Sequence, residues 1–193
     1  DSGTSMILAP SASAVLVCDG SGWYSVSYSL PPYWMHLTAD YTLTSTTSAQ
    51  KLFNGTANGA LTLPPGVYEF EAFLYLTTMS ATSGNGQFTF GGTATIDRVG
   101  YQVVGIDNSS PLNAGTATLS SSVTAGSKAS MVTAGTGTGL TATVRGMFLV
   151  SAGGTVIPQI ALVTAAAAVV KAGSSIRVRR LGESSQTYNG AWS

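Results

Sequence analysis

The sequence predicts an all-β protein, a jelly-roll or β-sandwich with a small N-terminal β-hairpin connector. Three observations lead to this fold class. Short runs rich in β-branched and aromatic residues recur along the chain, and apolar and polar residues alternate within them. Gly, Pro, Asn and Ser separate these runs. Helical signals are nearly absent, and about eight to ten short strands in one domain-sized segment are typical of a double-sheet sandwich.

The first 37 residues are predicted to form a hairpin followed by a Pro-rich connector. Residues 15–18 and 23–28 alternate as strands do, and the Gly-containing sequence at 19–22 is typical of a tight turn. The proline pair at 31–32 favours a stiff, extended segment. Cys18 lies in an apolar run and is expected to be buried, and as the only cysteine it has no partner for an internal disulfide.

The clearest strand pattern covers residues 67–77. Its alternate residues from Tyr68 to Leu76 are apolar and are expected to face the core. The opposite face is charged at one end, with Glu69 and Glu71, and aromatic at the other, with Phe73 and Tyr75. A strand face open to water does not normally carry two aromatic side chains. We therefore predict that the aromatic half contacts another subunit, with cover by a loop as the alternative.

The last predicted strand, over residues 174–181, complements that charged half. Ile176 and Val178 are expected to point inward, so that Arg177 and Arg179 point outward with the same spacing as the two glutamates. Opposite charges facing each other across neighbouring strands stabilise a sheet, so we expect these pairs to form. The candidate subunit interface is therefore Phe73, Tyr75, Glu69, Glu71, Arg177 and Arg179.

The remaining strand signals complete a jelly-roll domain over residues 38–182, followed by a C-terminal tail over 183–193. The segment 165–168 is a run of alanines, and it is expected to be extended because it is too short for a stable helix. Pro158 suggests an edge position or a bulge within its strand. The other strands are expected at 41–44, 49–53, 59–63, 87–90, 101–106, 117–123, 129–133, 141–151 and 155–164.

Charged residues are scarce. The chain has 8 Lys+Arg and 8 Asp+Glu, a formal net charge of zero, and 8% charged residues, against roughly 25% in an average soluble domain. A neutral chain lacks the basic surface that nucleic-acid binding needs, and without a long apolar stretch no membrane insertion is expected. So few charges protect a monomer poorly against association. We therefore expect part of the surface to be buried between subunits.

The residues for catalysis or metal binding are sparse, and the sequence predicts no enzyme, no cofactor and no metal site. Glu69 and Glu71 have a spacing compatible with a glycosidase pair, but pairing with arginines explains them better. The only histidine, His36, follows the Pro-rich connector, and Asp97 and Asp107 are scattered. Aromatic residues are the remaining binding signal, and the candidates for stacking on a ligand are Tyr33, Trp34, Tyr101 and Trp192.

Five segments of the chain together carry a resemblance to a known family. They are AQKLFN at 49–54, GALTLP at 59–64, GVYEFE at 66–71, GGTVIPQ at 153–159 and AGSSIRVR at 172–179. In combination they resemble the C-terminal jelly-roll domains of tailed-bacteriophage virion structural proteins of the tail-fibre, head-fibre and spike type, and the general plan is similar to the trimeric C1q/TNF jelly-roll. The resemblance implies a homotrimer, but it carries over no catalytic or ligand-binding residues.

The first functional hypothesis is thus a bacteriophage structural protein, a trimeric tail fibre or spike module. It would be assembled in the host cytoplasm and exposed on the virion, with other virion proteins as partners and host attachment, through a cell-surface glycan or protein, as a role to test. A capsid-attached head fibre or decoration protein is the alternative within the same class. A carbohydrate-binding module is the alternative from another class, and it would be a monomer with an exposed aromatic platform.

Overall fold

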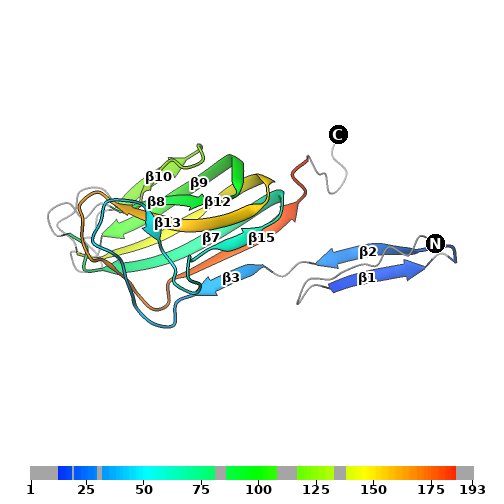
Figure 1. The fold of residues 1–193 in the computed structure, drawn as a ribbon, viewed down its shortest axis with the longest axis horizontal. Helices are drawn as coiled ribbons and strands as arrows, with labels where there is room; N and C mark the ends of the chain where they lie inside the picture. Colours follow the sequence, from blue (N-terminus) through cyan, green and yellow to red (C-terminus); the bar gives the residue numbers. More distant parts are fainter. Residues whose placement is uncertain are drawn as a thin grey trace.

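The computed structural model describes residues 13–18, 20–29, 32–80, 86–107, 117–132 and 138–185. These residues form fifteen strands and no helix, arranged as two facing antiparallel sheets and a separate hairpin (Figure 1). The predicted all-β sandwich is therefore confirmed.

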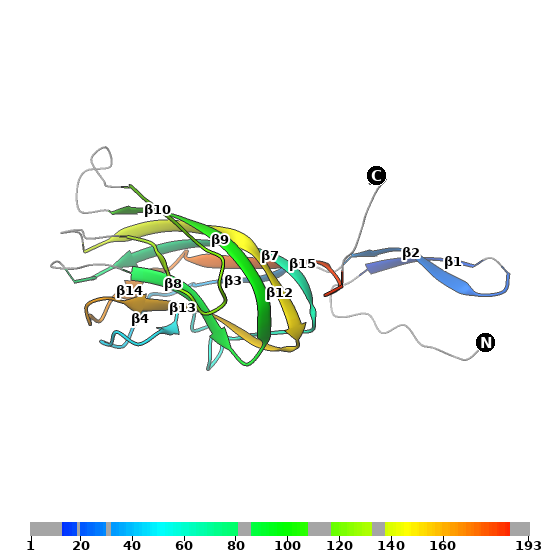
Figure 2. The ribbon, with the colours of Figure 1, turned by 90° about the horizontal axis from the view of Figure 1, so that it is seen from above.

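The hairpin consists of β1 (Ser13–Cys18) and β2 (Trp23–Ser29), as the sequence predicts. These two strands pair only with each other among the described strands, and both views place them beyond one end of the sandwich (Figure 1, Figure 2). The expected burial of Cys18 is wrong, because its side chain is exposed. The reason is that a two-stranded sheet standing apart from the sandwich has no second layer to cover it.

The larger sheet, called the main sheet below, has eight strands. Its order is β10-β9-β12-β7. On the other side of β7, β15 pairs with the first part of β7 and β14 pairs with the last two residues of β7. β3 extends the sheet beyond β15, and β4 extends it beyond β14. The strands are β3 (Tyr33–His36), β4 (Tyr41–Thr42), β7 (Gly66–Thr77), β9 (Thr95–Asp107), β10 (Ala117–Ser122), β12 (Leu140–Ala152), β14 (Val169–Val170) and β15 (Ser175–Gly182).

The second sheet has five strands. Its order is β11-β8-β13-β5, with β6 also paired to β13. Pro158 lies inside β13 and not at a sheet edge, at the point where the partner changes from β6 to β5, so the missing N–H falls in a gap of the ladder. The strands are β5 (Gln50–Lys51), β6 (Leu61–Leu63), β8 (Gly86–Gly92), β11 (Ala129–Ser130) and β13 (Gly154–Leu162).

β3 corrects the predicted end of the connector at residue 37. It pairs with β15, and its side chains alternate between half-buried and exposed, with Tyr33 and Met35 packed against the core. The strand therefore belongs to the sandwich. The proline pair obscured this, because the four residues after it are too few to show a clear strand period.

The core between the sheets is aromatic at its centre. The Phe70 ring lies 4.9 Å from that of Phe90 and 5.8 Å from that of Phe148, centroid to centroid. Gly105 of β9 faces the same layer, where a Cβ would fall 1.6 Å from the Met131 carbonyl oxygen. The two sheets can therefore approach this closely only because the residue is glycine.

Tyr101 of β9 also belongs to this core, and it corrects one predicted ligand contact. Its side chain is 4% exposed, and its hydroxyl lies 3.1 Å from the carbonyl oxygens of Phe88 and Ser127. Burial raises the pKa of the Tyr101 phenol above its ordinary value. Tyr101 lies on the same face of β9 as the buried Val99 and Val103, so it points between the sheets and cannot stack on a ligand.

Candidate functional site: the outer face of the main sheet

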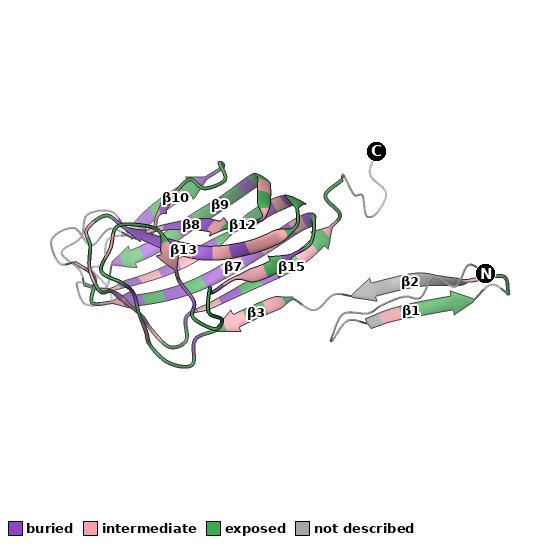
Figure 3. Ribbon diagram, viewed as in Figure 1, coloured by how far each residue is buried: buried purple, intermediate pink, exposed green. Residues whose placement is uncertain are grey.

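The six candidate interface residues and Trp34 lie on the face of the main sheet that points away from the core, called the outer face below. Buried residues alternate with exposed or partly exposed ones along β7 and β12 (Figure 3). This alternation places Glu69, Glu71, Phe73 and Tyr75 of β7 on the outer face, as predicted. The outer face divides into a charged half and an apolar half.

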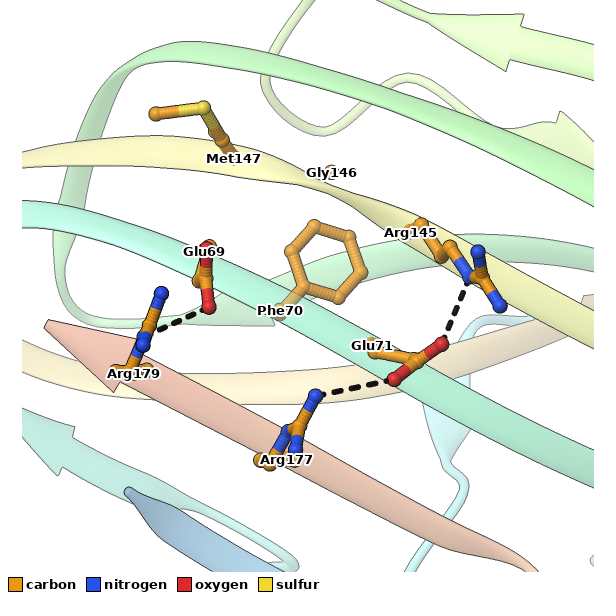
Figure 4. A pocket seen from close by; sticks show the side chains of 8 residues that line it. All are labelled: Glu69, Phe70, Glu71, Arg145, Gly146, Met147, Arg177 and Arg179. Carbon is orange, nitrogen blue, oxygen red and sulfur yellow. Dashed lines mark hydrogen bonds and ion pairs between the residues drawn. The ribbon is translucent and has the colours of Figure 1, made fainter. Parts of the chain in front are cut away.

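The charged half is a belt of five side chains across three strands, called the charged belt below (Figure 4). Glu71 stands between Arg145 of β12 and Arg177 of β15 in the strand register, and Glu69 stands beside Arg179. The predicted pairing of the two glutamates with Arg177 and Arg179 is confirmed. Arg145 of β12, which sequence reasoning missed, pairs with Glu71 from the other side of β7.

Each carboxylate of the charged belt is paired. Glu71 binds Arg145 Nε through Oε1 at 2.7 Å and Arg177 Nη2 through Oε2 at 3.3 Å. Glu69 Oε1 binds Arg179 Nε at 2.8 Å. Three guanidiniums against two carboxylates leave one positive charge in excess. The five side chains border an open hollow of about 340 Å³, with Met147 at its rim.

The ion pairs of the charged belt are exposed to water, so their contribution to stability is small. The exposed fractions of the side chains range from 38% for Glu69 to 71% for Arg145. Exposed pairs of this kind contribute roughly 0–1 kcal/mol each. The pairs therefore hold the arginine side chains in place more than they stabilise the fold.

The apolar half of the outer face is called the apolar patch below. Phe73 faces Thr143, which faces Val104, which faces Leu119, so one row crosses β7, β12, β9 and β10. Tyr75 and Ile106 stand in the next row, on either side of Thr141. The apolar members are Phe73 (47% exposed), Tyr75 (38%), Val104 (47%), Ile106 (45%) and Leu119 (76%).

The alternative that a loop covers the two aromatic residues does not hold for the described part of the chain, because Phe73 and Tyr75 remain exposed there. Sequence reasoning found Phe73 and Tyr75 but missed Val104, Ile106 and Leu119. These residues come from two other strands, and only the register of the sheet brings them beside Phe73.

Two of the predicted stacking residues lie on β3, at the edge of the outer face beside the charged belt. Trp34 is 65% exposed and stands opposite Arg177 in the register, and its ring centroid lies 4.5 Å from that of His36. Tyr33 points the other way and lines a small apolar pocket with Phe90 and Val178, and Trp34 borders the same pocket. Trp192 lies outside the described residues.

The described residues offer no metal site, since no three His, Cys, Asp or Glu side chains among them converge. Asp97 is exposed near the start of β9, whereas Asp107 is buried at its end. In the same part of the chain, no helix is long and apolar enough to span a membrane.

Comparisons with known proteins add little to this geometry. No family model matches the sequence, and no curated protein matches it. Among solved structures, one match is the structure of infectious bursal disease virus Gx strain, at 11% sequence identity and a TM-score of 0.19. The match covers 86% of this chain and 45% of that one, so this chain spans less than half of its length. A likeness this weak carries no argument about fold or function.

Proposed function

We propose that this protein is a structural module of a virus particle, a trimeric fibre or spike subunit whose copies associate through the apolar patch. The patch is the observation that carries the proposal. Five large apolar side chains lie exposed on adjacent rows of one sheet, with only threonines between them in the register. Contiguous apolar surface of this kind marks a contact with another molecule.

The apolar patch occupies about half of the outer face, and this half is the surface offered to another subunit. Five strands about 4.8 Å apart and up to about 40 Å long present roughly 1,000 Å² of sheet surface. A standard protein interface buries about 800 Å² on each partner. The apolar half presents about half of this sheet surface, roughly 500 Å², which is a large part of what a specific contact needs.

A second copy of the chain is the occupant that the composition favours. A chain with 8% charged residues and zero net charge has little electrostatic repulsion between its own copies. The sequence resemblance to trimeric virion proteins supports threefold closure, in which the apolar patch of one copy contacts a different surface of the next. The separate β1–β2 hairpin is suited to joining the sandwich to other virion proteins.

The two alternative functions predict different experimental results. A capsid-attached head fibre or decoration protein would use the same contact, and labelled antibodies on intact particles would find it on the capsid and not on the tail. A carbohydrate-binding module is favoured by one observation, the exposed indole of Trp34 at the edge of the sheet. Such a module would function as a monomer.

Light scattering on the purified chain tests the proposal. A trimer has three times the chain mass of 19.6 kDa, and we expect that mass at micromolar concentrations. A mass of one chain under the same conditions would overturn the trimeric assignment. A mass of two chains would keep the contact but reject threefold closure.

A further inference from the structure

We propose that the charged belt and Trp34 form a binding site for a sugar that carries a carboxylate group. This goes beyond assembly and rests on the proposed function only for its setting, the surface of a particle. The site lies on the outer face but outside the apolar patch, so it remains open when copies associate through that patch. Within the candidate interface drawn from the sequence, Glu69, Glu71, Arg177 and Arg179 then serve the ligand, whereas Phe73 and Tyr75 serve assembly.

The charged belt has both the charge and the free donors for a carboxylate. Its three guanidiniums exceed its two carboxylates by one positive charge. Arg145 and Arg179 each bind their glutamate through Nε, which leaves their Nη groups without a partner among the described residues. Guanidinium groups bind carboxylates in a planar, two-pronged geometry, which favours this anion over a spherical one.

Trp34 adds an apolar platform on the strand next to the charged belt, beside the hollow and not within its lining. It stands opposite Arg177 on the adjacent strand, so the two backbones are about 4.8 Å apart. A sugar ring lying on the indole would therefore place a substituent against the guanidinium of Arg177. His36 packs at 4.5 Å from the Trp34 ring and restricts its movement, which lowers the entropy lost when a ligand binds.

The hollow and its remaining oxygens complete the match to a sugar. At about 340 Å³ it lies within the size range of small-ligand sites, though it is shallow and open. The Glu69 and Glu71 carboxylates can accept hydrogen bonds from sugar hydroxyls with the lone pairs that the arginines leave free. An acidic peptide would use the arginines but has no need of a flat apolar platform, so the sugar accounts for more of the site.

The experiment is a calorimetric titration of the native protein with trigalacturonate at low salt. Fully methyl-esterified trigalacturonate is the matched ligand, because it keeps the rings and removes the charges. We expect a dissociation constant of about 1 mM for the acid, as suits a shallow site. Binding of the ester should be at least about tenfold weaker, and a tri-glutamate peptide should bind no better than the ester.

Three variants locate the binding. Arg177→Gln and Trp34→Ala should each weaken binding of trigalacturonate about tenfold. Lys128→Gln, which removes one positive charge beside β11 in the second sheet, should leave it unchanged. The proposal would be overturned if trigalacturonate bound no more tightly than its methyl ester or than the tri-glutamate peptide. It would also be overturned if trigalacturonate did not bind up to about 10 mM, or if Arg177→Gln kept full affinity for it.

Light scattering on the same samples separates this inference from the proposed function. A protein that is trimeric but binds no acidic sugar rejects only the sugar site. A monomer that binds trigalacturonate through Arg177 and Trp34 rejects only the assembly. Because both side chains are largely exposed, neither variant is expected to unfold the sandwich.

Discussion

The two halves of the outer face are made from the same strands yet differ in how their side chains are satisfied. In the charged belt, both carboxylates of β7 have an arginine partner within the chain. In the apolar patch, Phe73, Val104 and Leu119 have neighbours beside them but nothing above them in the described structure. Water solvates the first half well and the second half poorly.

This difference suggests a different role for each half of the outer face. A half whose charges are already paired gains little from burial against another protein, because desolvation offsets the Coulombic gain. A half of exposed apolar side chains gains roughly 25 cal/mol for each Å² that it removes from water. The apolar patch is therefore assigned to assembly, and the charged belt to a small ligand that arrives from solution.

The largest expected effect comes from placing a charge in the apolar patch. Phe73→Lys should reduce self-association by at least about 100-fold, because burying an unpaired ammonium group costs several kcal/mol. Sedimentation velocity measures the change. The matched control is Val163→Lys, since Val163 is 49% exposed and Phe73 47%, but Val163 lies outside the patch. Equal dissociation by both variants, or by neither, would remove the distinction between the halves.

The second largest effect is expected from salt, which should weaken binding at the charged belt but not association through the apolar patch. Between about 0.1 M and about 1 M NaCl the screening length falls from about 10 Å to about 3 Å. Affinity for trigalacturonate should fall about tenfold over this range, whereas the association constant of the chain should stay level or rise. Dissociation of the oligomer by salt would show that the charged belt, and not the apolar patch, holds the copies together.

A smaller effect is expected for the stability of the charged belt itself. Glu71→Gln removes the partner of both Arg145 and Arg177, and because these side chains are exposed the loss should be about 0.5–1 kcal/mol. Urea unfolding of a variant held monomeric by Phe73→Lys measures it without interference from assembly. A loss above about 3 kcal/mol would mean that the belt is a structural element of the fold.

The smallest effect concerns the end of the apolar patch near Tyr75. Asp40 binds Lys171 Nζ and accepts a hydrogen bond from Ala172 N at 2.9 Å, while Lys171 N donates to the Tyr75 carbonyl oxygen at 2.8 Å. The Lys171 hydrogen bond, followed by that of Ala172, lowers the pKa of Asp40 below its ordinary value of 3.8.

Because the pKa of Asp40 is lowered in the folded state, the ionised carboxylate stabilises the fold. This stabilisation is present above pH 3.8 and is lost as the pH falls through the pKa of Asp40 in the folded state. Asp40→Asn should therefore have a slightly lower melting temperature than the parent chain at neutral pH, and the difference should disappear in strong acid. A difference that persists in strong acid would show that the hydrogen bonds, and not the charge, are responsible.

The sequence predicted those parts of the fold and site that depend on local alternation. The two faces of β7 and the inward and outward residues of β15 follow directly from a period of two. The pairing of Glu69 and Glu71 with Arg177 and Arg179 followed as well, because equal spacing on two strands suggests a shared register.

Features that depend on which distant strands are neighbours were not predictable in this way. Arg145 and Leu119 reach the outer face only through the pairing of β12 with β7 and of β10 with β9. Tyr101 was misassigned because its flanking residues do not reveal which face meets the second sheet. Cys18 was misassigned because an apolar strand gives no sign that its sheet lacks a second layer.

Photo-cross-linking from position 119 tests the central claim most directly. Leu119, the most exposed member of the apolar patch, can be replaced by p-benzoylphenylalanine, with the same replacement at Val163 as the control. On irradiation of the assembled protein, we predict covalent products between chains from position 119 and only single chains from position 163. Single chains from position 119 in a protein that light scattering shows to be oligomeric would contradict the assignment of the apolar patch to assembly.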